Sequence, residues 1–132
     1  EFAHSDHRPD HAQGVLFMTG HAQPGAQGPD WPSVAQVCHQ QRITLLIYMG
    51  TSRSALIQAG LLQGLPAKTS VAVVQNASLP TQRETLTTLS ELVTAVQHEG
   101  LQSPSIIVVG DVVQGARAWQ RTASRKAARQ AA

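Results

Sequence analysis

The sequence is poor in cysteine, in charged residues and in aromatic residues, and it contains no long apolar run. Its single cysteine, Cys38, excludes an internal disulfide framework and agrees with a reducing compartment. We expect it to be a small buried apolar residue rather than a nucleophile. No apolar run approaches the roughly 20 residues that a membrane-spanning helix needs, and the start of the chain lacks the features of a secretory signal. We therefore expect a soluble, cytoplasmic domain without a membrane partner.

Charged residues make up 14% of the 132 residues, and apolar residues make up 42%. Charge is sparse compared with an average soluble protein, in which about a quarter of the residues carry it. The apolar content still suffices for a hydrophobic core, and the length suits one domain. The composition therefore predicts a single folded domain.

Negative charge is missing from the end of the chain. Residues 1–113 hold all eight acidic and five of the ten basic residues, whereas residues 114–132 carry the other five basic residues and no acidic one. Arginines recur there at every fourth position and would align on one face of a helix: Arg117, Arg121, Arg125 and Arg129. This stripe either contacts nucleic acid or another anionic partner, or belongs to a solvated helix or disordered tail. We favour the second interpretation, because charge asymmetry alone is weak evidence for a partner.

Short apolar runs alternate with segments of helical period from residue 14 onward. The runs predict strands at 14–20, 43–48, 70–76, 83–86 and 105–113. Helical patterns begin at 30–32 with Asp30 as the N-cap, run from 51 or 52 to 62, and span 88–98. This alternation predicts a single α/β domain, with a mostly parallel, mixed sheet of about five strands and helices on both faces. We divide the chain into a linker (1–13), the domain (14–113) and a basic tail (114–132).

Three predicted strand ends carry glycine or other small residues, at 19–21, 48–51 and 75–78. Ligands of open α/β sheets bind beyond the carboxyl ends of the strands, so we expect a site at this edge. Gly20 and Gly50 either let a ligand approach the backbone or simply end their strands in turns. Met49 stands where its strand leaves the sheet, and its soft, adaptable thioether suits a ligand contact.

Residues typical of other chemistries are absent or badly placed. Three histidines near the start have the spacing of a helical metal site, but Pro9 interrupts a helix there and we expect no metal: His4, His7 and His11. No nucleophile elbow, zinc-protease motif or Walker A motif occurs. Glu91 and Glu99 are expected to face solvent, so we expect no catalytic carboxylate pair.

A series of short blocks follows the order and spacing of a known family over residues 7–113. The blocks are Phe17-Met18-Thr19-Gly20-His21, Asp30-Trp31, Leu45-Leu46-Ile47-Tyr48-Met49-Gly50, Val71-Ala72-Val73-Val74-Gln75-Asn76-Ala77-Ser78 with Gln82-Arg83, Thr88-Leu89, and Ser103-Pro104 through Val113. Each block alone is weak, but the ordered series is specific. It resembles the C-terminal half of the uroporphyrinogen-III C-methyltransferases, in the tetrapyrrole methylase family.

The resemblance implies transfer of methyl groups from S-adenosylmethionine to pyrrole carbons of uroporphyrinogen III. The products would be precorrin-2, on the way to sirohaem, cobalamin or haem d1, and S-adenosylhomocysteine. Such chemistry needs few catalytic groups, because the sulfonium methyl is already activated and the protein mainly aligns the reactants and excludes water. Another member of the family, acting on a later corrin precursor, is the alternative within the enzymes. The Tyr-Met-Gly and Thr-Gly-His blocks favour uroporphyrinogen III.

The resemblance also assigns roles by position, none of them catalytic. The cofactor-binding residues would be Met49, Ala77, Tyr48 and Gly50. The substrate-binding residues would be His21, Arg8 and Met49, since a macrocycle rich in carboxylates favours arginine and histidine at the mouth of the cleft.

The chain departs from the family pattern in three respects. Ala77 stands where many members have glycine, and Gln75 stands where glutamate is common. The glycine-rich G-x-G-P-G-D and G-G-D-P loops of the family's N-terminal domain are absent from the sequence. The resemblance therefore implies one wall of a two-walled site, inactive without the N-terminal domain, in a protein that forms homodimers.

An alternative hypothesis, from a different functional class, is a stand-alone binding or scaffold domain that uses the basic tail. It predicts salt-dependent binding to nucleic acid that disappears when residues 115–132 are deleted. We favour the enzyme, because ordered motifs outweigh a run of charge.

Overall fold

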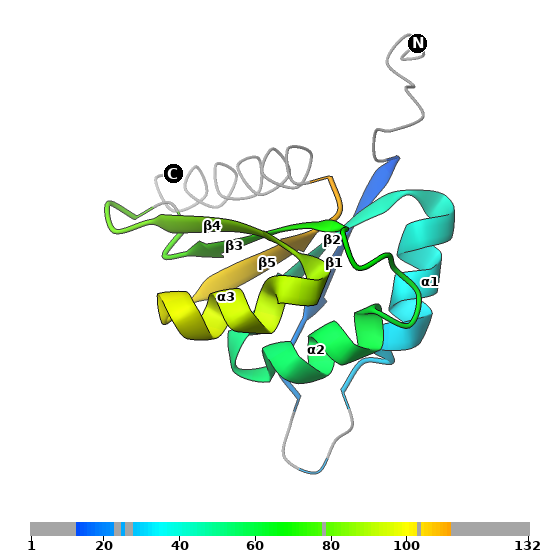
Figure 1. Cartoon of the computed structure of the whole chain (residues 1–132), viewed down its shortest axis with the longest axis horizontal. Helices are drawn as coiled ribbons and strands as arrows, with labels where there is room; N and C mark the ends of the chain where they lie inside the picture. The colour runs from blue at the N-terminus through cyan, green and yellow to red at the C-terminus, as the bar shows by residue number, and fades with distance from the viewer. Residues whose placement is uncertain (1–12, 23–24, 26–27, 78, 103, 112–132) are drawn as a thin grey trace, which may run out of the picture.

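The structure is a computed structural model that describes residues 13–22, 25, 28–77, 79–102 and 104–111 (Figure 1). The predicted basic tail, the three N-terminal histidines and Arg8 lie outside the described residues. Within the described ranges, no helix is long and apolar enough to cross a membrane.

Five strands and three α-helices make up the described part of the domain. In chain order they are β1 (Gly14–Thr19), α1 (Trp31–Gln41), β2 (Ile43–Tyr48), α2 (Ser54–Leu61), β3 (Ser70–Gln75), β4 (Arg83–Thr88), α3 (Leu92–Glu99) and β5 (Ser105–Val109). Short 3-10 turns, η2 (Thr51–Arg53) and η3 (Leu89–Glu91), lead into α2 and α3. All five predicted strands are present, although β4 continues to Thr88 and β5 ends at Val109, within the predicted 105–113. The helix predicted over 88–98 begins later, because Thr88 ends β4 and the next three residues form η3.

The strands form one sheet in the order β1-β2-β5-β3-β4. Only β1 and β2 pair in parallel, whereas β2 with β5, β5 with β3, and β3 with β4 are antiparallel. The prediction of a mostly parallel sheet is therefore wrong. Its basis is still visible, because β2 and β3 point the same way and are joined through α2. However, β5 lies between β2 and β3 and runs antiparallel to both. Likewise, β4 and β5 point the same way, and β3 lies between them and runs antiparallel to both.

The helices α1, α2 and α3 lie on one face of the sheet (Figure 1). Alternate residues of the central strands point toward them. Leu45, Ile47 and Ile107, for example, are fully buried in the core between the sheet and the helices. A smaller cluster occupies the opposite face: Leu46, Ala72, Ile106 and Val108. The expected helices on both faces are thus found on one face only, as far as the described residues reach.

Local sequence signals set the helix ends. Asp30 caps α1 as predicted, since its carboxylate accepts hydrogen bonds from the Ser33 backbone N–H (3.3 Å) and the Ser33 hydroxyl (2.8 Å). Gly100 ends α3 in the left-handed conformation, with φ +63°, which glycine adopts without steric cost. Such ends fix where each connection re-enters the sheet, and so which residues meet at its edge.

Candidate ligand pocket

A pocket of about 170 Å³ lies where β2 and β3 end and β5 begins. Because β5 runs antiparallel to both neighbours, its first residues lie beside their last ones, with Tyr48 opposite Ile106 and Gln75 opposite Ser105. The residues that line the pocket are mostly apolar: Tyr48, Met49, Val74, Asn76, Ala77, Leu79, Pro104, Ser105 and Ile106. Three of the four predicted cofactor residues, Tyr48, Met49 and Ala77, are among them.

Met49 and Asn76 stand at matching places, one residue beyond the ends of β2 and β3. Both have a left-handed backbone, with φ +57° and +55°. Asparagine tolerates this conformation, but for a residue such as methionine it costs about 1–2 kcal/mol. Met49 is also half-exposed, so its side chain gains little packing that would offset this strain. Strained backbone of this kind is common at ligand sites.

Tyr48 closes β2 and borders the pocket. Its ring stacks on that of Phe17 in β1, with ring centroids 6.0 Å apart and an interplanar angle of 18°. Partial burial raises the pKa of the Tyr48 phenol above its ordinary value. The phenol therefore stays protonated at neutral pH, and Tyr48 offers an apolar ring with a neutral hydroxyl.

Gly50 does not line the pocket, although it follows Met49 directly. A Cβ atom at Gly50 would lie 3.0 Å from side-chain atoms of Ile47 and Ile107. Gly20 donates its backbone N–H to the Tyr48 carbonyl oxygen at 2.7 Å. Close packing within the chain thus accounts for the small size of Gly50, which shapes the turn that carries Met49.

His21 follows Gly20 at the same edge of the sheet and is exposed. Its backbone N–H donates to the Thr19 hydroxyl oxygen at 3.1 Å. The side chain does not line the pocket, but the preceding Gly20 packs against Gly50, so this predicted substrate residue lies beside the turn that carries Met49 and outside the pocket. Arg8, the other predicted substrate residue, is outside the described ranges.

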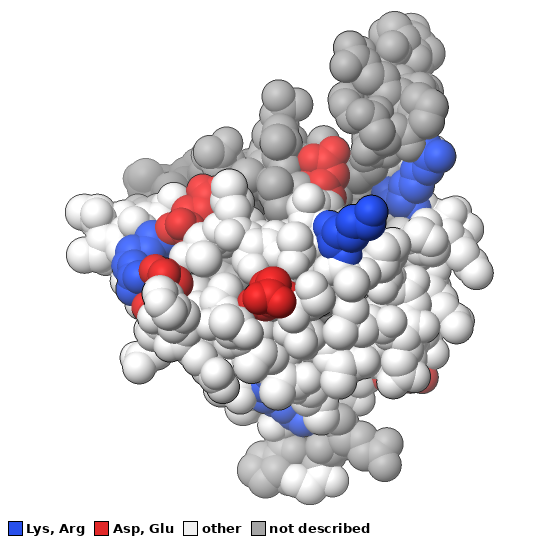
Figure 2. Space-filling view, in the orientation of Figure 1, with Lys and Arg blue, Asp and Glu red and all other residues white. Residues whose placement is uncertain are grey.

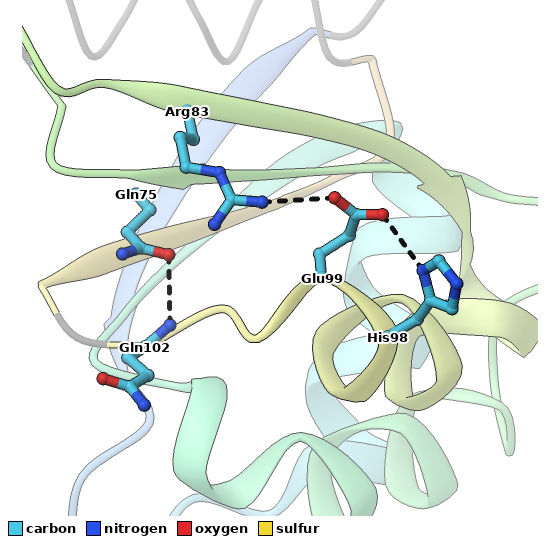
Figure 3. Close-up of polar contacts among 5 residues, drawn as sticks. All are labelled: Gln75, Arg83, His98, Glu99 and Gln102. Carbon is cyan, nitrogen blue, oxygen red and sulfur yellow. Dashed lines mark hydrogen bonds and ion pairs between the residues drawn. The ribbon is translucent and has the colours of Figure 1, made fainter.

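Sequence reasoning missed the pocket residues that β5 and its preceding loop contribute, above all Pro104 and Ser105. The Ser-Pro block was visible, but nothing in the sequence placed β5 between β2 and β3. It also left Gln75 unexplained. The side-chain oxygen of Gln75 accepts a hydrogen bond from the Gln102 backbone N–H at 3.2 Å, which ties the end of β3 to the loop before β5 (Figure 3).

Of the two glutamates expected to face solvent, Glu91 is exposed and Glu99 is partly exposed. Glu99 contacts Arg83 on β4 at 3.2 Å and the neighbouring His98 at 3.1 Å, and all three side chains are at least a third exposed (Figure 3). Charged side chains are otherwise scattered over the face of the molecule shown in Figure 2. Across the described residues there is no group of three or more histidines, cysteines or acidic residues that could hold a metal.

Cys38 is buried in α1, as predicted, and burial raises the pKa of its thiol. A thiol of this kind is a poor nucleophile, because the thiolate is the reactive form.

Comparison with known proteins shows what the chain as a whole is similar to. No family model matches the chain. Siroheme synthase of Hydrogenovibrio crunogenus is 38% identical over 106 residues, which are 80% of this chain and 22% of that protein. Siroheme synthase of Yersinia pestis is 44% identical over 105 residues, or 79% of this chain and 21% of that protein. The chain thus spans about a fifth of the length of these relatives.

Solved structures agree with the sequence relatives. Uroporphyrin-III C-methyl transferase from Thermus thermophilus, complexed with S-adenyl homocysteine, is 27% identical with a TM-score of 0.62, over 82% of this chain and 46% of that one. Cobalt precorrin-4 methyltransferase has a TM-score of 0.65 at 21% identity, over 78% and 42% of the two chains, and shows the fold alone. The fold is therefore that of a methyltransferase class that acts on tetrapyrroles. The chain is a domain of the tetrapyrrole methylase family.

Proposed function

We propose that this chain is the C-terminal half of a methyltransferase that uses S-adenosylmethionine to convert uroporphyrinogen III into precorrin-2. The observation that carries the proposal is the meeting of Tyr48 and Met49 with Ala77, which follows a different strand, at one apolar pocket. The likeness to a structure that holds S-adenyl homocysteine supports it. The protein would act in the cytoplasm on the way to sirohaem, cobalamin or haem d1.

The pocket suits part of the cofactor. Its apolar walls, which include Val74 and Leu79, exclude water from a reacting methyl group, and the backbone at Ala77 can contact the adenosine. When bound, S-adenosylmethionine supplies a methyl group that is already activated as a sulfonium. The work left to the chain is alignment, and Met49 stands at the boundary between this pocket and solvent.

The substrate would lie outside the pocket, against the edge that carries His21 and Met49. The carboxylates of uroporphyrinogen III would contact the His21 imidazole and the Arg8 guanidinium, which bind anions through charge-assisted hydrogen bonds. Met49 would then touch both reactants. This arrangement requires no catalytic acid or base from the described residues.

The half-site needs a second wall. Met49 and Leu79 are 51% and 54% exposed at the mouth of the pocket, and exposed apolar side chains of this kind mark a surface that a partner covers. We assign that role to an N-terminal domain with the missing glycine-rich loops. The chain would be inactive alone, and the complete protein would form a homodimer.

A chimeric enzyme tests the proposal. Residues 14–111 replace the matching stretch of Hydrogenovibrio crunogenus siroheme synthase, and methyl transfer from S-adenosylmethionine to uroporphyrinogen III is measured. We expect precorrin-2 from the chimera, much less from its Met49→Ala variant, and none from the chain alone. A folded chimera that methylates only a later corrin precursor would assign the domain to another member of the family. Normal turnover by the isolated chain would refute the half-site.

A further inference from the structure

Backbone carbonyl groups of two neighbouring residues at the start of β5 accept hydrogen bonds from both left-handed residues of the pocket. The Met49 backbone N–H donates to the Ser105 carbonyl oxygen at 3.2 Å, and the Asn76 N–H donates to the Pro104 carbonyl oxygen at 3.0 Å. β5 lies between β2 and β3, so this one segment sets the position of both flanking turns. The separation of the pocket walls therefore depends on residues 104 and 105.

Ser105 makes a second contact with the turn that carries Met49, this time through its side chain. The Ser105 hydroxyl donates to the Thr51 hydroxyl oxygen at 3.3 Å, and these two residues are only 6% and 5% exposed. Thr51 follows Gly50, so Ser105 contacts the turn on both sides of Met49 and Gly50. Isoleucine side chains crowd Gly50, and a buried hydroxyl without a partner in such surroundings is unfavourable. Each of the two hydroxyl groups thus needs the other.

We propose that Ser105 is a positioning residue, whose carbonyl and hydroxyl groups together hold Met49 in its left-handed conformation at the cofactor wall. The cofactor part of this inference rests on the function proposed above, whereas the hold on the turn does not. A methionine rarely keeps φ near +57° unless surrounding groups fix it. The two hydrogen bonds of Ser105, with the Met49 N–H and with the Thr51 hydroxyl, fix the backbone of the turn before and after Met49.

Two variants each remove one hydroxyl: Ser105→Ala and Thr51→Val. Thr44→Val is the matched control, because Thr44 is also buried and its hydroxyl donates to the Asp111 carbonyl oxygen (3.4 Å) near the other end of β2. The measurement is amide hydrogen exchange without ligand. The exchange rate of the Met49 amide is divided by that of Ile47, which is fully buried in the same sheet and reports opening of the whole domain.

We expect this ratio to rise about fivefold in each of the two variants, the loss expected for one intramolecular hydrogen bond. It should stay unchanged in Thr44→Val, and Ser105→Thr should preserve it by keeping the hydroxyl. An unchanged ratio in both variants, or an equal rise in Thr44→Val, would overturn the positioning role.

The affinity for S-adenosylhomocysteine provides the second readout. We expect the dissociation constant to rise about fivefold in Ser105→Ala and Thr51→Val, in step with the exchange ratio. This affinity is measured in the chimera, because the proposed half-site lacks its second wall in the chain alone. If the unmodified chimera binds no S-adenosylhomocysteine, the proposed function fails, and the exchange ratio still decides the role of Ser105.

Discussion

Gly20 and Gly50 pack backbone against backbone, so closely that a Cβ atom on Gly20 would lie 2.6 Å from the Cα atom of Gly50. This contact joins the end of β1 to the turn that carries Met49. It explains why position 20 needs glycine, whereas isoleucine side chains crowd position 50. It also brings the residue after Gly20, the proposed substrate contact His21, to the same edge of the sheet as Met49.

Gly20→Ala should destabilise the domain by about 2 kcal/mol, because backbone must move to admit a methyl group into a filled space. Urea unfolding monitored by circular dichroism measures the change. Gly14→Ala, at the start of β1, is the control. The atom nearest to its new methyl group outside the adjoining residues, on Ile43, would be 4.0 Å away, so the effect should be near zero. Equal effects of the two substitutions would argue against the packing described for Gly20.

Met49→Gly should stabilise the domain while weakening ligand binding. Glycine removes the left-handed strain of about 1–2 kcal/mol, whereas its greater freedom in the unfolded chain costs about 0.5–1 kcal/mol, so a net gain of up to about 1.5 kcal/mol is expected. Met49→Leu keeps the strain and serves as the control. Thermal unfolding and titration with S-adenosylhomocysteine give the two quantities. A loss of stability in Met49→Gly would show that the side chain contributes packing that its exposure conceals.

Gln75→Glu should leave the loop before β5 intact, because a carboxylate oxygen can still accept the Gln102 backbone N–H. Residue 75 also stands opposite Arg83 in the β3–β4 pair, which favours an acidic side chain there. Gln75→Ala removes the acceptor, and the Gln102 amide should exchange with solvent about fivefold faster. Equal exchange in the two variants would mean that this hydrogen bond does not hold the loop.

Cys38 should react slowly with thiol reagents in the folded protein and rapidly in urea, because burial both shields the sulfur and raises its pKa. The raised pKa also has a consequence for stability. The folded thiol keeps its proton at alkaline pH where the unfolded thiol has lost it, so the free energy of unfolding falls as pH rises past the ordinary thiol pKa. The Cys38→Ala variant should lose this part of the alkaline dependence. Fast labelling without denaturant would contradict the burial.

The local elements of the fold were predictable because their signals are local. The strand positions and the Asp30 cap follow from apolar period and capping chemistry within a few residues. Strand direction was not predictable, because the insertion of β5 between β2 and β3 depends on contacts between residues about 30–60 positions apart.

The pocket residues show the same contrast between local signals and contacts between distant residues. Tyr48, Met49 and Ala77 could be named from the sequence, since each lies in a recognisable block. Ser105 could not be named, because its importance depends on lying beside Thr51, which is 54 residues away. The left-handed backbone at Met49 was equally hidden, since methionine carries no preference for it.

Binding of S-adenosylhomocysteine at Met49 is the most direct test of the account. The chain has two methionines, and Met18 points to the helix-covered core, so their methyl groups report on the pocket and on the core separately. The measurement uses the chimera, which supplies the second wall, labelled with ¹³C at the methionine methyl groups. In its NMR spectrum, with the two resonances assigned through Met18→Leu and Met49→Leu, S-adenosylhomocysteine should shift the Met49 resonance and leave that of Met18 in place. A saturating amount that moves neither resonance, or moves only that of Met18, would contradict a cofactor wall at Met49.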